Sequence, residues 1–124
     1  MTATVYKIED ADAWSAAIAA GLYEGSNDDR RDGFIHFSTA EQLAGTAAKH
    51  FANRPNLVLV AVFAQSLGDA LKWEASRGGA LFPHLYAALD PALCSAPVAM
   101  PLGDDGLPQL PETLPAPPEP AMRR

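Results

Sequence analysis

The hydrophobic and polar positions along the chain follow the short periods of strands and helices, and they end in a run of strands. Residues 4–8 alternate between apolar and polar side chains and are rich in β-forming types, which predicts a strand. The eight consecutive apolar residues at 57–64 predict a buried central strand. The other apolar stretches predict strands at residues 33–37, 70–74, 81–87 and 96–102. Pro97 predicts an edge position for the last strand, because proline cannot donate to the ladder.

The first predicted helix follows the first strand. Asp10 suits an N-cap and Gly21 suits the left-handed residue after a helix, so we expect a helix at residues 11–20. The apolar side of this helix is expected to consist of Trp14, Ile18 and Leu22. The polar, glycine-containing residues 23–32 predict a solvated loop, with a lid over a pocket as the alternative.

A second helix is predicted to begin at a capping box. Ser38-Thr39-Ala40-Glu41 has the S-x-x-E pattern, in which the serine caps the helix that follows. Apolar residues then recur with helical spacing at Leu43, Ala47 and Phe51. Two N-terminal helices followed mostly by strands predict an α+β domain with small mixed sheets.

Proline and charge divide the 124 residues into two parts. Nine of the eleven prolines lie between Pro91 and Pro120, whereas most charged residues precede them. We therefore expect one globular domain at residues 1–103 and a flexible, proline-rich tail at residues 104–124.

Charge and cysteine content exclude several kinds of protein. The net charge of −6 and the isoelectric point of about 4.8 argue against nonspecific nucleic-acid binding, which requires a basic face. The single cysteine, Cys94, excludes an internal disulfide and a zinc site made of cysteines. No apolar run approaches the length of a membrane span. We expect a cytoplasmic protein with no membrane segment and no bound metal, and the sequence leaves its oligomeric state open.

The first candidate site lies around the strand at residues 33–37. Alternation along this strand puts Phe34, His36 and Ser38 on one face. Because Ser38 is also expected at a helix N-terminus, an imidazole, a hydroxyl and free helix amides meet there, which suits a phosphate or another anion. The alternative is a core histidine with one hydrogen bond beside an ordinary helix cap.

Two further candidates follow in the second half of the chain. Phe82, His84 and Tyr86 share one strand face, where aromatic rings can stack on a flat ligand such as nicotinamide or a base. Glu74 ends a strand, and Arg77 precedes two glycines that could help it hold a carboxylate or phosphate. The alternatives are a half-buried edge strand and a solvated hairpin turn.

Several segments, taken in order, carry a family resemblance. They include Tyr6-Lys7-Ile8, Gly25-Ser26, Asp32-Gly33-Phe34-Ile35-His36-Phe37-Ser38-Thr39, Trp73-Glu74, Ser76-Arg77-Gly78-Gly79 and Phe82-Pro83-His84-Leu85-Tyr86. Over residues 4–102 the chain resembles the bacterial family named domain of unknown function 952. The resemblance implies an ADP-ribosyltransferase-like fold, whose members bind NAD in a cleft between two short sheets. The layout from Gly21-Leu22 to Ser38 is also similar to that of the RNA 2′-phosphotransferases of this fold.

The resemblance implies an NAD-binding, ADP-ribosyltransferase-like enzyme, that is, a transferase whose ligand is a nucleotide. Catalysis is then expected from His36, Glu74 and His84, with Glu74 polarising the ribose 2′-hydroxyl as the C1′–N bond loosens. Ligand binding is expected from Tyr6, Tyr23, Ser26, Ser38, Thr39, Arg77 and Tyr86, with Tyr23 or Tyr86 stacking on nicotinamide. The alternatives are a nucleotide- or metabolite-binding module without chemistry, and a partner-binding domain that uses its proline-rich tail.

Overall fold

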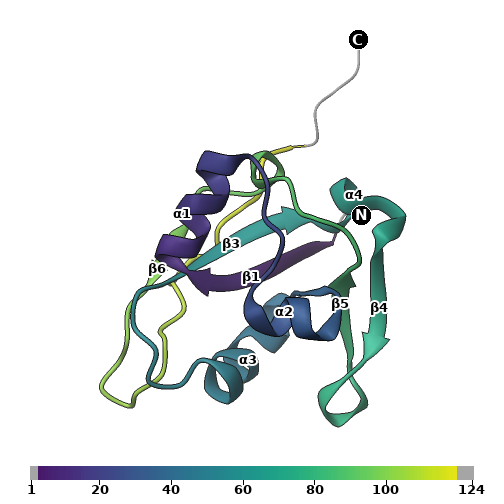
Figure 1. The fold of residues 1–124 in the computed structure, drawn as a ribbon. Coiled ribbons are helices and arrows are strands. Elements are labelled where there is room, and N and C mark those ends of the chain that lie inside the picture. Colours follow the sequence, from purple (N-terminus) through teal and green to yellow (C-terminus); the bar gives the residue numbers. More distant parts are fainter. Residues whose placement is uncertain (1–2, 120–124) are drawn as a thin grey trace.

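The computed structural model describes residues 3–119, apart from the side chain of Arg77, and it has the predicted α+β architecture (Figure 1). Its strands are β1 (Thr4–Asp10), β2 (Ile35–His36), β3 (Leu57–Phe63), β4 (Leu71–Ala75), β5 (Leu81–Leu85) and β6 (Val98–Met100). Its α-helices are α1 (Ala11–Ala20), α2 (Asn27–Asp32), α3 (Leu43–His50) and α4 (Ala64–Leu67). Short 3₁₀ turns are η1 (Ala40–Gln42), η2 (Gly68–Ala70), η3 (Arg77–Gly79) and η4 (Pro91–Leu93). Within this described part, no helix is long and apolar enough to cross a membrane.

The strands form two three-stranded sheets that are antiparallel, rather than the mixed sheets predicted. The first sheet has the order β1-β3-β6, and the second has the order β2-β5-β4. Each predicted strand corresponds to one of these six, and β6 lies at a sheet edge as expected. A bridge between Tyr6 and Ser38 joins the sheets, with reciprocal backbone hydrogen bonds of 2.8 and 2.9 Å. This bridge brings β1 beside the end of β2.

The first sheet buries apolar side chains on both of its faces. On one face, Val5 packs in a cluster with Trp14 of α1 and with Phe37. On the other face, Ile8 packs in a cluster with Leu43 of α3. Because alternate residues of β1 point to opposite faces, this strand contributes to both cores.

Helix α1 has the bounds and the caps that the sequence predicts. The Asp10 carboxylate accepts hydrogen bonds from two amides of the first turn, and the glycine after the helix has a φ of +75°. The predicted apolar side is only partly right. Trp14 is buried, but Ile18 and Leu22 are 51% and 45% exposed, because the buried face of the helix runs through Trp14 and Ala17.

The segment at residues 23–32 is not the loop that its composition predicts. It contains helix α2, which begins at a capping box formed by Ser26 and Asp29. Asp29 is buried in this helix, although the segment is strongly polar. The helix lies next to β5 and β1 in Figure 1. Its side chains line the space between the two sheets.

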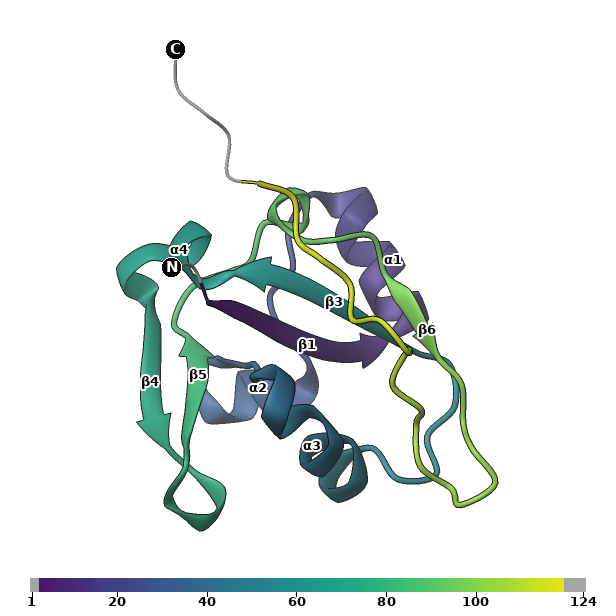
Figure 2. The same cartoon turned by 180° about the vertical axis from the view of Figure 1, so that it is seen from behind.

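The chain beyond β6 runs back across the first sheet, as Figure 2 shows in yellow. Leu110 and Leu114 pack on the apolar face that contains Ile8, and the Asn53 amide donates to the Gly106 carbonyl oxygen at 2.6 Å. The boundary predicted at residue 103 therefore does not end the packed part of the chain. Residues 120–124 of the predicted tail lie outside the described residues.

Candidate functional site

Two histidines from neighbouring strands form the centre of the candidate site. His36 of β2 lies opposite His84 of β5 in the strand register, and their ring centroids are 5.5 Å apart. The Phe34 ring stacks on His84 at 4.1 Å and lies 4.6 Å from the His36 ring. The two histidines, which the sequence singles out separately, therefore share one site.

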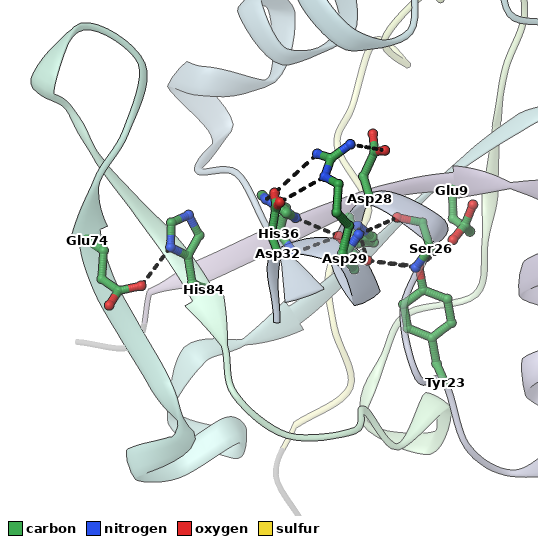
Figure 3. Close-up of polar contacts among 11 residues, drawn as sticks. Glu9, Tyr23, Ser26, Asp28, Asp29, Asp32, His36, Glu74 and His84 are labelled. Carbon is green, nitrogen blue, oxygen red and sulfur yellow. Dashed lines mark hydrogen bonds and ion pairs between the residues drawn. The ribbon is translucent and has the colours of Figure 1, made fainter. Parts of the chain in front are cut away.

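His36 is held between two aspartates of α2 (Figure 3). Its Nδ1 lies 2.6 Å from Oδ1 of Asp29, and its Nε2 lies 2.9 Å from Oδ2 of Asp32. Carboxylates only accept, so both contacts are hydrogen bonds at the same time only when both ring nitrogens carry hydrogen. The arrangement therefore suits a charged imidazolium that donates at both ends.

Asp29 is an almost fully buried carboxylate, 3% exposed, that binds a lysine and a histidine. Besides His36, it accepts from Lys7 Nζ at 2.8 Å and from the Ser26 amide at 2.9 Å. Burial alone would raise the pKa of this carboxyl, but the hydrogen bonds from His36 and Lys7 and the charge of Lys7 outweigh it. The pKa of Asp29 is consequently held well below its usual range, and the ionised carboxylate fixes both neighbours in place.

A buried tyrosine and glutamate complete the polar network beside Asp29 (Figure 3). The Tyr23 hydroxyl donates to Glu9 and lies 3.4 Å from Oδ2 of Asp29. Burial raises the pKa of Tyr23, and the neighbouring carboxylates raise it further. The ring of Tyr23 packs edge-on against Trp14 in the core and does not line the pocket described below, so the structure does not place this ring beside that pocket.

His84 has a carboxylate partner of its own on the neighbouring strand β4. Oε1 of Glu74 lies 2.8 Å from Nδ1 of His84 and accepts from the Tyr86 hydroxyl at 2.8 Å. The hydrogen bonds from His84 and Tyr86 lower the pKa of Glu74, and Glu74 raises the pKa of Tyr86 in return. Because Nδ1 must donate to the carboxylate, the neutral ring keeps an acceptor at Nε2. The contact with Glu74 therefore leaves Nε2 of His84 as the ring nitrogen available to a ligand.

A pocket of about 260 Å³ lies between the two sheets, lined by side chains from β1, α2, β2, α3 and β5. Five of the predicted site residues line it, namely Tyr6, Ser26, His36, Ser38 and His84. Four others do not, namely Tyr23, Thr39, Glu74 and Tyr86. The side chain of Arg77 lies outside the described residues.

The helix N-terminus predicted at Ser38 does not offer an open anion site. The capping box uses Thr39 and Gln42 instead of Ser38 and Glu41. The Thr39 amide donates to Oε1 of Gln42 at 3.0 Å, and the Gln42 amide donates to the Thr39 hydroxyl at 3.3 Å. Ser38 shares a hydrogen bond of 2.8 Å with the Thr46 hydroxyl instead. The side chains of the capping box therefore accept hydrogen bonds from the Thr39 and Gln42 amides, whereas the sequence analysis expected free amides that could bind an anion.

Three residues that organise the site are not among those predicted, namely Lys7, Asp29 and Asp32. The two aspartates lie in the segment interpreted as a solvated loop. A local signal was present, because Ser26 and Asp29 have the spacing of a capping box. Lys7 has no such signal, since a lysine in an alternating strand normally faces solvent.

Comparison with known proteins identifies the family. The chain belongs to the family described as "Protein of unknown function (DUF952)", whose model matches residues 8–95. No curated protein matches the chain.

Solved structures of one protein, CC0527 from Caulobacter crescentus, are similar to the chain. A crystal structure is 52% identical with a TM-score of 0.83, covering 86% of this chain and 93% of that chain. A crystal structure of a double mutant is 51% identical with a TM-score of 0.82 and the same coverage. A solution NMR structure is 52% identical with a TM-score of 0.77, covering 86% of this chain and 91% of that chain.

Proposed function

We propose that the protein is an ADP-ribosyltransferase-like enzyme that binds NAD in the pocket between its two sheets. The observation that carries this proposal is the pair of histidines, each fixed by its own carboxylate, on the wall of one pocket. The position of the pocket supports it as well, because the resemblance to the ADP-ribosyltransferase-like fold implies an NAD cleft between two short sheets.

His36 is the proposed hydrogen-bond donor to the ligand. Its Nε2–H points at Asp32, whose side chain is one-third exposed, so a ribose hydroxyl or a phosphate oxygen can take the place of that carboxylate. Ser38 lines the same pocket and offers a hydroxyl. Of the aromatic side chains that line the pocket, Tyr6 and Phe82 are those against which the nicotinamide ring packs in this proposal.

His84 is the proposed base, and Glu74 is its positioning residue. In the transfer, the bond between ribose C1′ and the nicotinamide nitrogen breaks, and its electron pair leaves with nicotinamide. An acceptor nucleophile forms the new bond to C1′ and gives its proton to Nε2 of His84. Because Glu74 does not line the pocket, its proposed contribution is to orient His84 and stabilise the protonated ring, rather than to touch the ribose hydroxyl.

Binding is tested by titrating the protein with NAD. We expect a saturable heat in calorimetry and shifts of the His36 and His84 ring signals in NMR spectra. The absence of both heat and shifts at millimolar NAD would sink the proposal.

Transfer is tested by measuring nicotinamide release from NAD by chromatography. Since a positioned base contributes roughly 10²–10⁴-fold, His84→Gln should slow release at least about 100-fold while NAD still binds. Glu74→Gln should lower the rate and change its pH dependence, because the charge that stabilises protonated His84 is lost. Glu24→Gln, the same change at an exposed glutamate outside the pocket, is the control. It should leave the rate of nicotinamide release and the pH dependence of that rate unchanged. Binding of NAD without release would make the protein a nucleotide-binding module instead of an enzyme.

A further inference from the structure

A second hollow adjoins the histidine pocket and extends the space open to a ligand. It has a volume of about 410 Å³ and shares four lining residues with the histidine pocket, namely Ile8, Ser26, Asp28 and Phe51. The histidine pocket, at about 260 Å³, is smaller than the roughly 300–1,000 Å³ typical of ligand pockets. A ligand seated at the histidines therefore has room to continue into the second hollow.

The arginines whose side chains the structure describes all lie along this continuous space. Arg31 lines the histidine pocket and forms ion pairs with Asp28 and Asp32. Arg30 and Arg54 line the second hollow, and among the described residues neither has a carboxylate within ion-pair distance. The guanidinium groups of Arg30 and Arg54 therefore form no ion pair with an acidic side chain of the described residues.

Arg54 is held in place by an aromatic ring. Its guanidinium carbon lies 4.9 Å from the centroid of Phe51, which lines both hollows. A guanidinium stacked on a ring keeps its N–H edges free, and those edges match two oxygens of a phosphate. The stacking also reduces the side-chain freedom that is lost on binding.

Two carboxylates also line the second hollow, but both already have partners. Glu9 is 6% exposed and accepts from the Tyr23 hydroxyl and from the Asp10 amide. Asp28 is paired with Arg31 at 3.2 Å. The partners of Glu9 are neutral, so its negative charge remains, whereas the charge of Asp28 is offset by Arg31. Arg30 and Arg54 together outweigh Glu9 at this hollow, although the whole chain has a net charge of −6.

We propose that the second hollow binds the phosphate groups of a nucleotide through Arg30 and Arg54, while the ribosyl end of that nucleotide reaches the histidine pocket. A pyrophosphate offers oxygens on two phosphorus atoms, which suit two guanidinium groups that line the same hollow. The identity of the ribosyl end as that of NAD rests on the proposed function, whereas the phosphate site rests on the arginines alone.

Calorimetric titrations with inorganic pyrophosphate, ADP, NAD and nicotinamide riboside test this site on the full chain. The double variant Arg30→Gln/Arg54→Gln removes the two guanidinium groups. The matched control, Lys49→Gln/Lys72→Gln, removes the same charge from exposed positions that line neither hollow. Asp28→Asn removes the paired carboxylate that faces the hollow.

We expect the arginine variant to bind pyrophosphate and ADP about 100-fold more weakly, because each charge-assisted contact is worth roughly a factor of ten. The lysine control should bind both within about threefold of the native chain, since screened surface charges contribute little. Asp28→Asn should bind both about twofold more tightly. Nicotinamide riboside, which has no phosphate, should bind the native chain and the arginine variant alike.

The four probes separate failure of this site from failure of the proposed function. The phosphate site is refuted if the native chain binds neither pyrophosphate nor ADP at millimolar concentration, or if the lysine control loses as much affinity as the arginine variant. Binding of pyrophosphate and ADP without binding of NAD supports the phosphate site and contradicts the proposed function. Binding of NAD with equal affinity to the native chain and the arginine variant supports the proposed function and contradicts the phosphate site.

Discussion

Replacing Asp29 with asparagine tests whether one buried carboxylate holds the site together. Asp29 is 3% exposed and accepts hydrogen bonds from Lys7, His36 and Ser26. Asparagine keeps the size but removes the charge, which leaves Lys7, itself 5% exposed, without its buried counter-ion. Removing one partner of a buried ion pair costs about 3–5 kcal/mol. We therefore expect Asp29→Asn to lose about that much free energy of unfolding at pH 7.

The free energy of unfolding that is lost in Asp29→Asn should become smaller as the pH falls. The pKa of Asp29 is lower in the folded chain than in the unfolded chain, so the folded chain binds fewer protons at this position. Stability that depends on ionised Asp29 is therefore complete above the unfolded pKa of about 3.9 and is lost as the pH falls below it. The free-energy difference between the native chain and Asp29→Asn should be constant between about pH 7 and pH 5, and it should narrow below about pH 4.

Urea unfolding followed by circular dichroism at a series of pH values measures both effects. Asp28→Asn is the matched control, because Asp28 belongs to the same helix but its side chain is 67% exposed. Its ion pair with Arg31 lies in solvent, so the control should remain within about 1 kcal/mol of the native chain. The reasoning is refuted if Asp29→Asn loses less than about 1 kcal/mol, or if its loss is the same at pH 7 and pH 3.

Three further changes test other contacts. Gly25→Ala should cost about 1–3 kcal/mol or more, because Gly25 has a φ of +106° and an added Cβ would lie 2.7 Å from Cβ of Asp29; an unchanged thermal midpoint contradicts this. Burial raises the pKa of Cys94 to about 12, so its thiol should react with a disulfide reagent at pH 8 at least about 100-fold more slowly in the folded chain than in urea, and equal rates would show that the thiol is accessible. Deleting residues 104–124 should lower the free energy of unfolding by about 2–4 kcal/mol, because Leu110 and Leu114 leave the apolar face of the first sheet; urea unfolding of the shortened chain with an unchanged midpoint rules out that contribution.

Capping residues and apolar patterns within a segment predict the helices and strands that are stabilised by contacts within that segment. Helix α1 has its own capping residues, Asp10 and a following glycine, and each strand has its own apolar pattern. The pairing of strands is not local. Alternation assigns His36 and His84 to faces of their strands, but it contains no information on which strand lies beside which. The separation of the two rings could therefore be known only from the structure.

Tertiary contacts explain why helix α2 and the buried charges were not predicted. The sequence of Asn27–Asp32 contains no apolar residue, so it has no helical hydrophobic period. Its capping box and the ion pair between Asp29 and Lys7 hold it in place. Likewise, the polar positions of β1 are typical of a solvent-facing edge, yet Lys7 and Glu9 are buried because they pair with Asp29 and Tyr23.

The partners of the two histidines give them opposite hydrogen-bonding capacity at the pocket. The ring nitrogens of His36 face Asp29 and Asp32, which only accept, so a ligand acceptor that displaces Asp32 takes the place of a carboxylate at Nε2. His84 donates at Nδ1 to Glu74, so the same ligand meets a lone pair at Nε2. With ring centroids 5.5 Å apart, one histidine can hold a ligand oxygen while the other removes a proton from an attacking group. Binding alone requires no such division between a donor and a base, and for this reason we favour the enzyme over the binding module.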